Sequence, residues 1–110
     1  MQKITKETQD KISQLQILEQ NLQNVLLQKQ AFQMELNETE NAAEEISKTK
    51  EDVYKLLGQI MLKVPKENIE KELIRKKDIL NLRLKSLEKQ ESQFKKETEK
   101  LRQEVLKKIG

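Results

Sequence analysis

Apolar residues recur in alternating steps of three and four along residues 1 to 52. Two heptad series carry them, Leu15, Leu22, Lys29, Leu36 and Ala43 in one and Leu18, Val25, Phe32, Thr39 and Ile46 in the other. This spacing is typical of a helix that pairs through a coiled-coil seam. The segment holds no proline or glycine and closes on the polar stretch SKTKED. We therefore expect one long helix over about residues 5 to 48.

Residues 66 to 110 repeat this pattern. Leucine or phenylalanine stands at 73, 80, 87, 94 and 101, and the adjoining series contains Leu84, Thr98 and Val105. Two helices of nearly equal length with a short connection are expected to fold back as an antiparallel hairpin. A register in which facing residue numbers sum to a constant pairs Ala43 with Leu73, Leu36 with Leu80, Phe32 with Leu84, Leu22 with Phe94 and Leu15 with Leu101.

Charge favours the same arrangement. Residues 1 to 52 carry six lysines against ten acids, whereas residues 66 to 110 carry fourteen Lys or Arg against nine acids. Opposite arms attract and like arms repel, although each exposed pair contributes little. Within the register, Lys29 lies one turn from Glu91. These two polar seam residues either pair with each other and help to fix the register, or extend separately to water.

The segment between the helices changes its period. Residues 53 to 65, VYKLLGQIMLKVP, are nearly all apolar or β-favouring and are divided by one glycine. They predict two strands, Val53 to Leu57 and Ile60 to Val64, around a Gly58-Gln59 turn. Ile60, Leu62 and Val64 would share one face, with Met61 and Lys63 on the other. The alternative is an apolar, helical corner. Because a lone two-stranded hairpin is marginal in water, we expect the segment to need partners.

Composition narrows the class of protein. The 110 residues are 37% charged, 35% hydrophobic and 3% aromatic, which fits one extended helical domain better than a globular core. Histidine and cysteine are absent, which excludes imidazole and thiol catalysis, disulfides and ordinary zinc sites. The glutamates are spread around helix surfaces, and adjacent Glu44 and Glu45 point in different directions. We expect no enzymatic activity, no cofactor and no metal site.

Other partner classes are disfavoured as well. No apolar run approaches the length of a membrane span, and the N-terminal stretch lacks the apolar region of a signal peptide, so a soluble cytoplasmic protein is expected. The second helix carries the basic residues Arg75, Lys76, Lys77, Arg83 and Lys85, which could follow a phosphate backbone. Acids interrupt this run and no aromatic platform accompanies it. A solvated helix face explains it better, and we expect neither nucleic acid nor membrane as partner.

The whole chain resembles the β-type subunit of the prefoldin family. The resemblance rests on a helix, then VYKLLGQIMLKVPKENIEKEL, then a helix running through LRLKSLEKQESQFKKETEKL. Tyr54, Gly58 and the step from Val64 to Glu67 match the family's aromatic, turn glycine and entry to the second helix. Pro65 departs from the pattern, since a polar cap is expected there. Proline supplies no side-chain acceptor, so the sequence leaves the start of the second helix open.

This resemblance implies a single domain over residues 1–110, with a coiled-coil helix in 1–52, a β-hairpin in 53–65 and a second coiled-coil helix in 66–110. It implies a mainly α fold in which the β-hairpin joins a β-barrel between subunits, in a hexamer of two α and four β subunits. The expected assembly residues are Val53, Tyr54, Leu56, Leu57, Gly58, Ile60, Met61, Leu62 and Val64. By resemblance, the complex captures unfolded proteins without ATP and transfers them to a group II chaperonin.

The helix tips are the expected client-binding end. The candidate residues are Ile4, Ile12 and Leu15 from the first helix and Val105, Leu106 and Ile109 from the second. The register leaves these residues with few partners, and exposed apolar groups suit weak, sequence-tolerant capture. Alternatively, they continue the coiled coil or fray. A coiled-coil scaffold or tether that holds no clients is the alternative function, but a tether needs only a polar turn at the bend.

Overall fold

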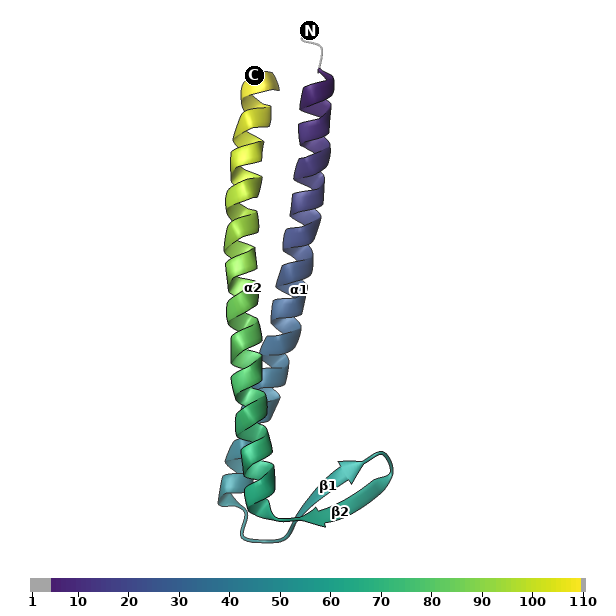
Figure 1. Cartoon of the computed structure of the whole chain (residues 1–110), viewed down its shortest axis with the longest axis vertical. Coiled ribbons are helices and arrows are strands. Elements are labelled where there is room, and N and C mark those ends of the chain that lie inside the picture. The colour runs from purple at the N-terminus through teal and green to yellow at the C-terminus, as the bar shows by residue number, and fades with distance from the viewer. Residues whose placement is uncertain (1–4, 110) are drawn as a thin grey trace. The chain divides into compact units, whose positions relative to one another are not determined.

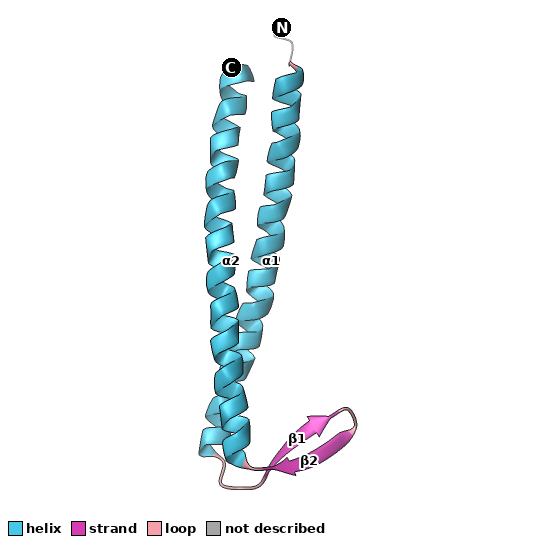
Figure 2. Cartoon of the chain, in the orientation of Figure 1, coloured by secondary structure: helices cyan, strands magenta, loops and turns pink. Residues whose placement is uncertain are grey.

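The computed structural model describes residues 5–109. The chain forms α1 (Lys6–Lys48), β1 (Val53–Leu57), β2 (Ile60–Val64) and α2 (Lys66–Ile109), in that order (Figures 1 and 2). These bounds confirm the two long helices and the intervening strand pair. The chain divides into two compact units. Unit 1 combines the residues up to Gln30 with those from Lys85 onward, and unit 2 is Ala31–Leu84.

The start of α1 is capped by a threonine pair. The backbone N–H of Thr8 donates to Thr5 Oγ1 at 3.2 Å, and the two side-chain oxygens lie 3.0 Å apart. Glu7 adds a negative charge in the first turn, where the helix dipole favours it. A local cap therefore explains why the helix begins at residue 6.

In unit 1, the two helical segments run antiparallel. Lys11 pairs with Glu104 at 3.5 Å, and Lys29 pairs with Glu91 at 3.5 Å. The second contact confirms the predicted pairing of these two seam residues. The buried seam positions of this unit are Thr8, Val25, Leu87, Thr98 and Val105. The heptad pattern thus identifies the buried stripe, including Thr98 in place of an apolar residue, and Thr8 extends the series of Leu15 by one heptad.

Unit 2 contains the tightest apolar cluster. Leu36, Leu80 and Leu84 are buried together, and Phe32 packs against them. Leu80 is only 2% exposed. This cluster contains both residues of the predicted pairs Leu36 with Leu80 and Phe32 with Leu84, which confirms the register here. Arg83 lies over the Phe32 ring, with its Cζ 5.4 Å from the ring centroid, and covers the edge of the cluster.

The two strands form an antiparallel hairpin with the predicted turn. Val53 faces Val64 at one end and Leu57 faces Ile60 at the other, so Gly58 and Gln59 are the two loop residues. Gly58 has a φ of 60°, and no described non-glycine residue has a positive φ. This combination is that of a type II′ turn, which requires glycine at its first central position. The alternative of a helical corner is wrong.

Pro65 stands directly before α2. Its carbonyl accepts from the backbone N–H of Asn68 at 3.1 Å and of Ile69 at 3.5 Å. The fixed φ of proline suits the entry to a helix, and a backbone acceptor replaces the missing side-chain cap. The start of α2 at Lys66, which the sequence leaves open, is thereby explained.

Candidate functional site

Both faces of the β-hairpin are exposed. Leu56 and Met61 are cross-strand partners on one face and are 66% and 69% exposed. Leu57 and Ile60 are partners on the other face and are 52% and 62% exposed. The hairpin projects sideways from the base of the helices within unit 2 (Figure 1). Contiguous apolar surface of this kind marks an interaction site in a soluble protein.

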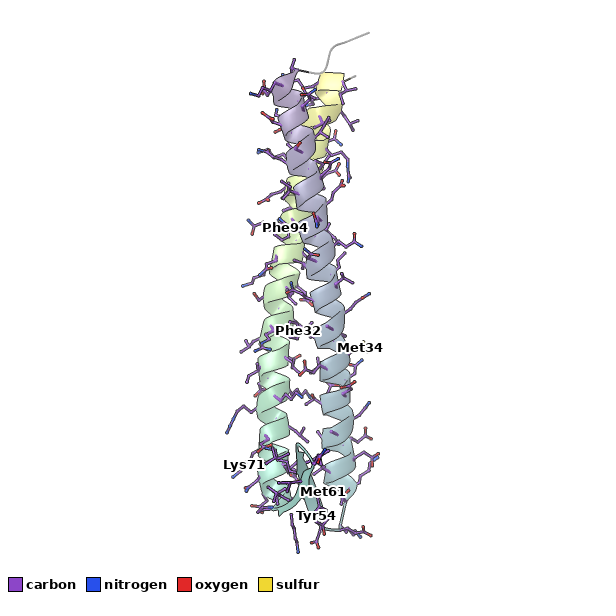
Figure 3. The ribbon with its side chains drawn as sticks, turned by 90° about the vertical axis from the view of Figure 1, so that its right-hand side faces the viewer. Phe32, Met34, Tyr54, Met61, Lys71 and Phe94 are labelled. Atoms are coloured by element: carbon purple, nitrogen blue, oxygen red, sulfur yellow. The ribbon has the colours of Figure 1, made fainter. Side chains whose placement is uncertain are left out.

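The other predicted assembly residues extend this surface. Tyr54 and Leu62 are 53% and 45% exposed, and Gly58 is exposed at the turn. Tyr54 and Met61 both lie on the hairpin (Figure 3). Val53 and Val64 face each other at the base of the hairpin and are half-buried. The structure therefore brings all nine residues together in one element, and their role in assembly stays a prediction.

Ion pairs connect the hairpin with neighbouring parts of unit 2. Lys55 Nζ donates to both carboxylate oxygens of Glu72 in α2 at 3.2 Å. Lys63 Nζ lies 3.2 Å from the carboxylate of Asp52, which precedes β1. Both pairs are solvated, so each stabilises the chain only weakly. They occupy polar positions and leave the apolar side chains of the hairpin uncovered.

The helix ends in unit 1 differ from the expectation in one respect. Leu106 and Ile109 are 56% and 47% exposed, as expected, but Val105 is only 6% exposed. Val105 stays buried because it continues the seam series of Leu84 and Thr98. Ile12 and Leu15 are half-buried, and Ile4 lies outside the described residues. Contact with clients stays a prediction for all six residues.

The structure also shows an exposed apolar surface on α1 in unit 1 that was not predicted from the sequence. Ile17 and Leu27 are both 58% exposed, and Leu26 is 38% exposed. A shallow open groove of about 440 Å³ is lined by Glu19, Leu22, Gln23, Leu26, Leu27 and Gln30. This surface could have been predicted, because these apolar residues lie outside the two seam series. A coiled coil normally has polar residues at such heptad positions.

Within residues 5–109, no group of three or more His, Cys, Asp or Glu side chains could hold a metal ion. Over the same range, neither helix is long and apolar enough to cross a lipid bilayer.

A family model described as Prefoldin subunit matches residues 9–110, which is nearly the whole chain. The chain belongs to the prefoldin family. It is 36% identical to prefoldin subunit beta of Pyrobaculum neutrophilum, in an alignment that covers all of this chain and 89% of that protein. It is 37% identical to prefoldin subunit beta of Pyrococcus furiosus, over 96% of this chain and 92% of that protein. These matches confirm the resemblance inferred from the hairpin and heptad motifs.

The fold also matches a known prefoldin structure. The crystal structure of the prefoldin beta subunit from Thermococcus strain KS-1 superimposes with a TM-score of 0.88 at 34% identity. The match covers 96% of this chain and 94% of that chain. The two long helices and the small antiparallel hairpin are therefore a prefoldin β fold. Because prefoldin subunits are chaperone co-factors, the chain is assigned to this class.

Proposed function

We propose that this chain is a β-type subunit of a prefoldin hexamer, assembled from two α and four β subunits. Its hairpin joins the hairpins of neighbouring subunits, and its helix ends hold unfolded proteins without ATP and pass them to a group II chaperonin. The observation that carries this proposal is the hairpin, whose two faces both expose large apolar side chains.

The energetics of the hairpin support the assembly step. Five large apolar side chains, Leu56, Leu57, Ile60, Met61 and Leu62, remain between 45% and 69% exposed. Covering them would contribute on the order of 1 kcal/mol each. The open strand edges offer backbone hydrogen bonds to further strands as well. A tether would gain nothing from this surface, because a polar turn would connect its helices equally well.

The surface chemistry of the helix ends suits client capture. Leu106 and Ile109 are exposed beside Lys107 and Lys108 in the last turn of α2. Apolar groups among charged ones can bind many apolar segments weakly, because no single pocket has to fit. Weak binding of this kind favours release to a downstream chaperonin.

Aggregation of a chemically unfolded test protein measures the holding activity. The chain would be mixed with a prefoldin α subunit, without ATP, as wild type and as the double variant Leu106→Ser with Ile109→Ser. Leu82→Ser is the matched control, since Leu82 is 67% exposed on α2 but lies in unit 2. We expect the wild type and the control to suppress aggregation equally and the double variant to lose most of this suppression.

The assembly state must be measured on the same samples. Protection by the assembled double variant equal to that of the wild type would exclude these helix ends as the client site. Correct assembly without protection in any sample would favour the tether function. Adding a group II chaperonin with ATP to the protected samples tests the transfer step, for which we expect recovery of native test protein.

A further inference from the structure

Lys66 has an unusual position for a basic residue. It is the first residue of α2, where the helix dipole disfavours positive charge. Glu67 and Glu70 follow in the first turns, and Lys66 Nζ lies 3.7 Å from the Glu70 carboxylate. The side chain of Lys66 is 37% exposed, and its ammonium group is in hydrogen-bond contact with protein groups. Its hydrogen-bond partners lie at the C-terminal end of α1 and just after it.

The ammonium group of Lys66 binds the C-terminal end of α1. It donates to the carbonyl oxygen of Thr49 at 3.0 Å and to that of Ser47 at 3.4 Å. Ser47 lies in the last turn of α1 and Thr49 directly follows the helix, a region where a helix has unpaired acceptors and attracts cations. The local sequence supplies no glycine cap at this end. Lys66 is electrostatically unfavourable at the start of α2, but its ammonium group supplies hydrogen-bond donors to carbonyl groups at the end of α1.

Hydroxyl and backbone groups satisfy the preceding carbonyls of the same turn. Thr49 Oγ1 donates to the Glu45 carbonyl at 2.8 Å, and the Thr49 N–H donates to the Ile46 carbonyl at 3.1 Å. Lys66 is thus the only described residue from α2 that donates to the backbone at this end of α1. The two carbonyls that it binds, those of Thr49 and Ser47, precede Lys66 by 17 and 19 residues in the chain.

These contacts lie at both attachment points of the hairpin. The chain enters β1 shortly after Ser47 and Thr49, and β2 returns to α2 through Pro65 alone. Most apolar side chains of the hairpin are exposed and therefore do little to fix its orientation, although Val53 and Val64 at its base are half-buried. The polar contacts near its base are the Lys66 hydrogen bonds, the Lys55–Glu72 pair to α2 and the Lys63–Asp52 pair across the base itself.

We propose that Lys66 is a positioning residue that holds the β-hairpin in the orientation needed for subunit assembly. The proposal rests on the proposed function, in which the hairpin is the assembly element. It assigns Lys66 a role outside the apolar contact surface itself. A hairpin that is held in place before association loses less conformational freedom on binding, and its affinity for partner subunits is correspondingly higher.

Assembly with a prefoldin α subunit would be titrated for Lys66→Met, Lys66→Arg and Lys71→Met. Methionine keeps the apolar stem and the helix propensity, and arginine restores the donor. Lys71 is the control, an exposed lysine of α2 without an ion pair in the described part of the chain. We expect Lys66→Met to weaken assembly about tenfold, the value of one charged hydrogen bond. Lys66→Arg should recover most of this loss, and Lys71→Met should match the wild type.

The orientation of the hairpin can be measured directly in the full chain. Because the chain has no cysteine, spin labels at Gln59→Cys in the turn and Glu40→Cys on α1 report one distance within unit 2. We expect a narrow distance distribution in the wild type and a broader one in Lys66→Met, at unchanged helical circular dichroism.

The outcomes separate the two proposals. Equal affinity and equal distance distributions for Lys66→Met and the wild type would overturn the role of Lys66. A wild type that does not assemble at all, or a Leu62→Asp variant that assembles normally, would instead overturn the proposed function. Loss of helicity in both Lys66 variants would assign Lys66 to the stability of the fold and likewise reject a positioning role.

Discussion

Three threonines occupy buried seam positions, and their hydroxyl groups differ in whether they have a hydrogen-bond partner. Thr39 Oγ1 donates to the Glu35 carbonyl at 2.8 Å, and Thr8 Oγ1 lies 3.0 Å from Thr5 Oγ1. Thr98 is 4% exposed, and its hydroxyl has no hydrogen-bond partner among residues 5–109. A buried hydroxyl without a partner destabilises the folded state, because it loses its hydrogen bonds to water.

Replacing Thr98 by valine should therefore stabilise the helix pair. Valine keeps the β-branched shape and removes the unpaired hydroxyl, so we expect the free energy of unfolding to rise by about 1 kcal/mol. Urea denaturation followed by circular dichroism measures this change. Thr39→Val is the matched control, since it removes a hydroxyl that has a partner, and it should give little or no gain. Equal effects of the two substitutions would contradict this account.

For single residues, the sequence predicted burial correctly where the heptad period determines which residues face the other helix. The buried positions of Leu36, Leu80 and Leu84 follow from the heptad, because a helix brings every third and fourth residue to one face. Val105 was expected to be exposed because the register left it with few partners, but the same heptad buries it. The partners of Lys66 could not be predicted, since they depend on how the chain turns between the helices.

The hairpin is the element in which one residue sets the local geometry. Gly58 adopts a φ of 60°, and a Cβ atom built on it meets nothing within 4 Å. The cost of a side chain at this position therefore comes from the backbone conformation alone. The two-residue turn was predictable because a single glycine between two apolar, β-favouring runs is typical of a tight hairpin loop.

Gly58→Ala should loosen the hairpin without affecting the helices. A positive φ costs an alanine about 1 kcal/mol, so the strand amides should exchange with solvent about fivefold faster. Hydrogen exchange in the isolated chain measures this rate. Gln59→Ala is the control, because Gln59 has no positive φ. Unchanged exchange in Gly58→Ala, or equal acceleration in both variants, would show that the turn does not limit hairpin stability.

A lysine and a glutamate pair across the seam of unit 1. Lys29 Nζ lies 3.5 Å from the carboxylate of Glu91, and their side chains are 33% and 15% exposed. Glu91 also lies 4.0 Å from Lys95, which compensates it in part. Partly buried ion pairs contribute little net stability, but one charge left without its partner is unfavourable.

Lys29→Leu alone should lower the free energy of unfolding by about 1 to 2 kcal/mol, because Glu91 loses its seam partner. The double variant Lys29→Leu with Glu91→Leu should be more stable than either single variant. Denaturant unfolding of the four proteins, as a double-mutant cycle, gives the coupling between the two residues. A double variant less stable than both single variants would show that the seam does not accept an apolar layer here.

Across the described residues, the buried core and the largest exposed apolar surface lie in different elements. The buried residues belong to the two helices, whereas both faces of the hairpin are exposed. The physical chemistry of the sequence predicts this division, since a two-stranded apolar hairpin cannot cover its own faces. It does not identify the partners, because many surfaces could cover apolar strands. The number of subunits and the holding of unfolded proteins were therefore inferred from the family resemblance.

The mass of the complex tests the central claim, that the hairpin is the assembly element, most directly. Native mass spectrometry would be applied to the chain mixed with a prefoldin α subunit, as wild type, Leu62→Asp and Leu82→Asp. Leu62 lies on the hairpin and Leu82 is exposed on α2. We expect hexamers for the wild type and Leu82→Asp, and dissociated, still helical chains for Leu62→Asp. Intact hexamers with Leu62→Asp would contradict the assembly role of residues 53 to 64.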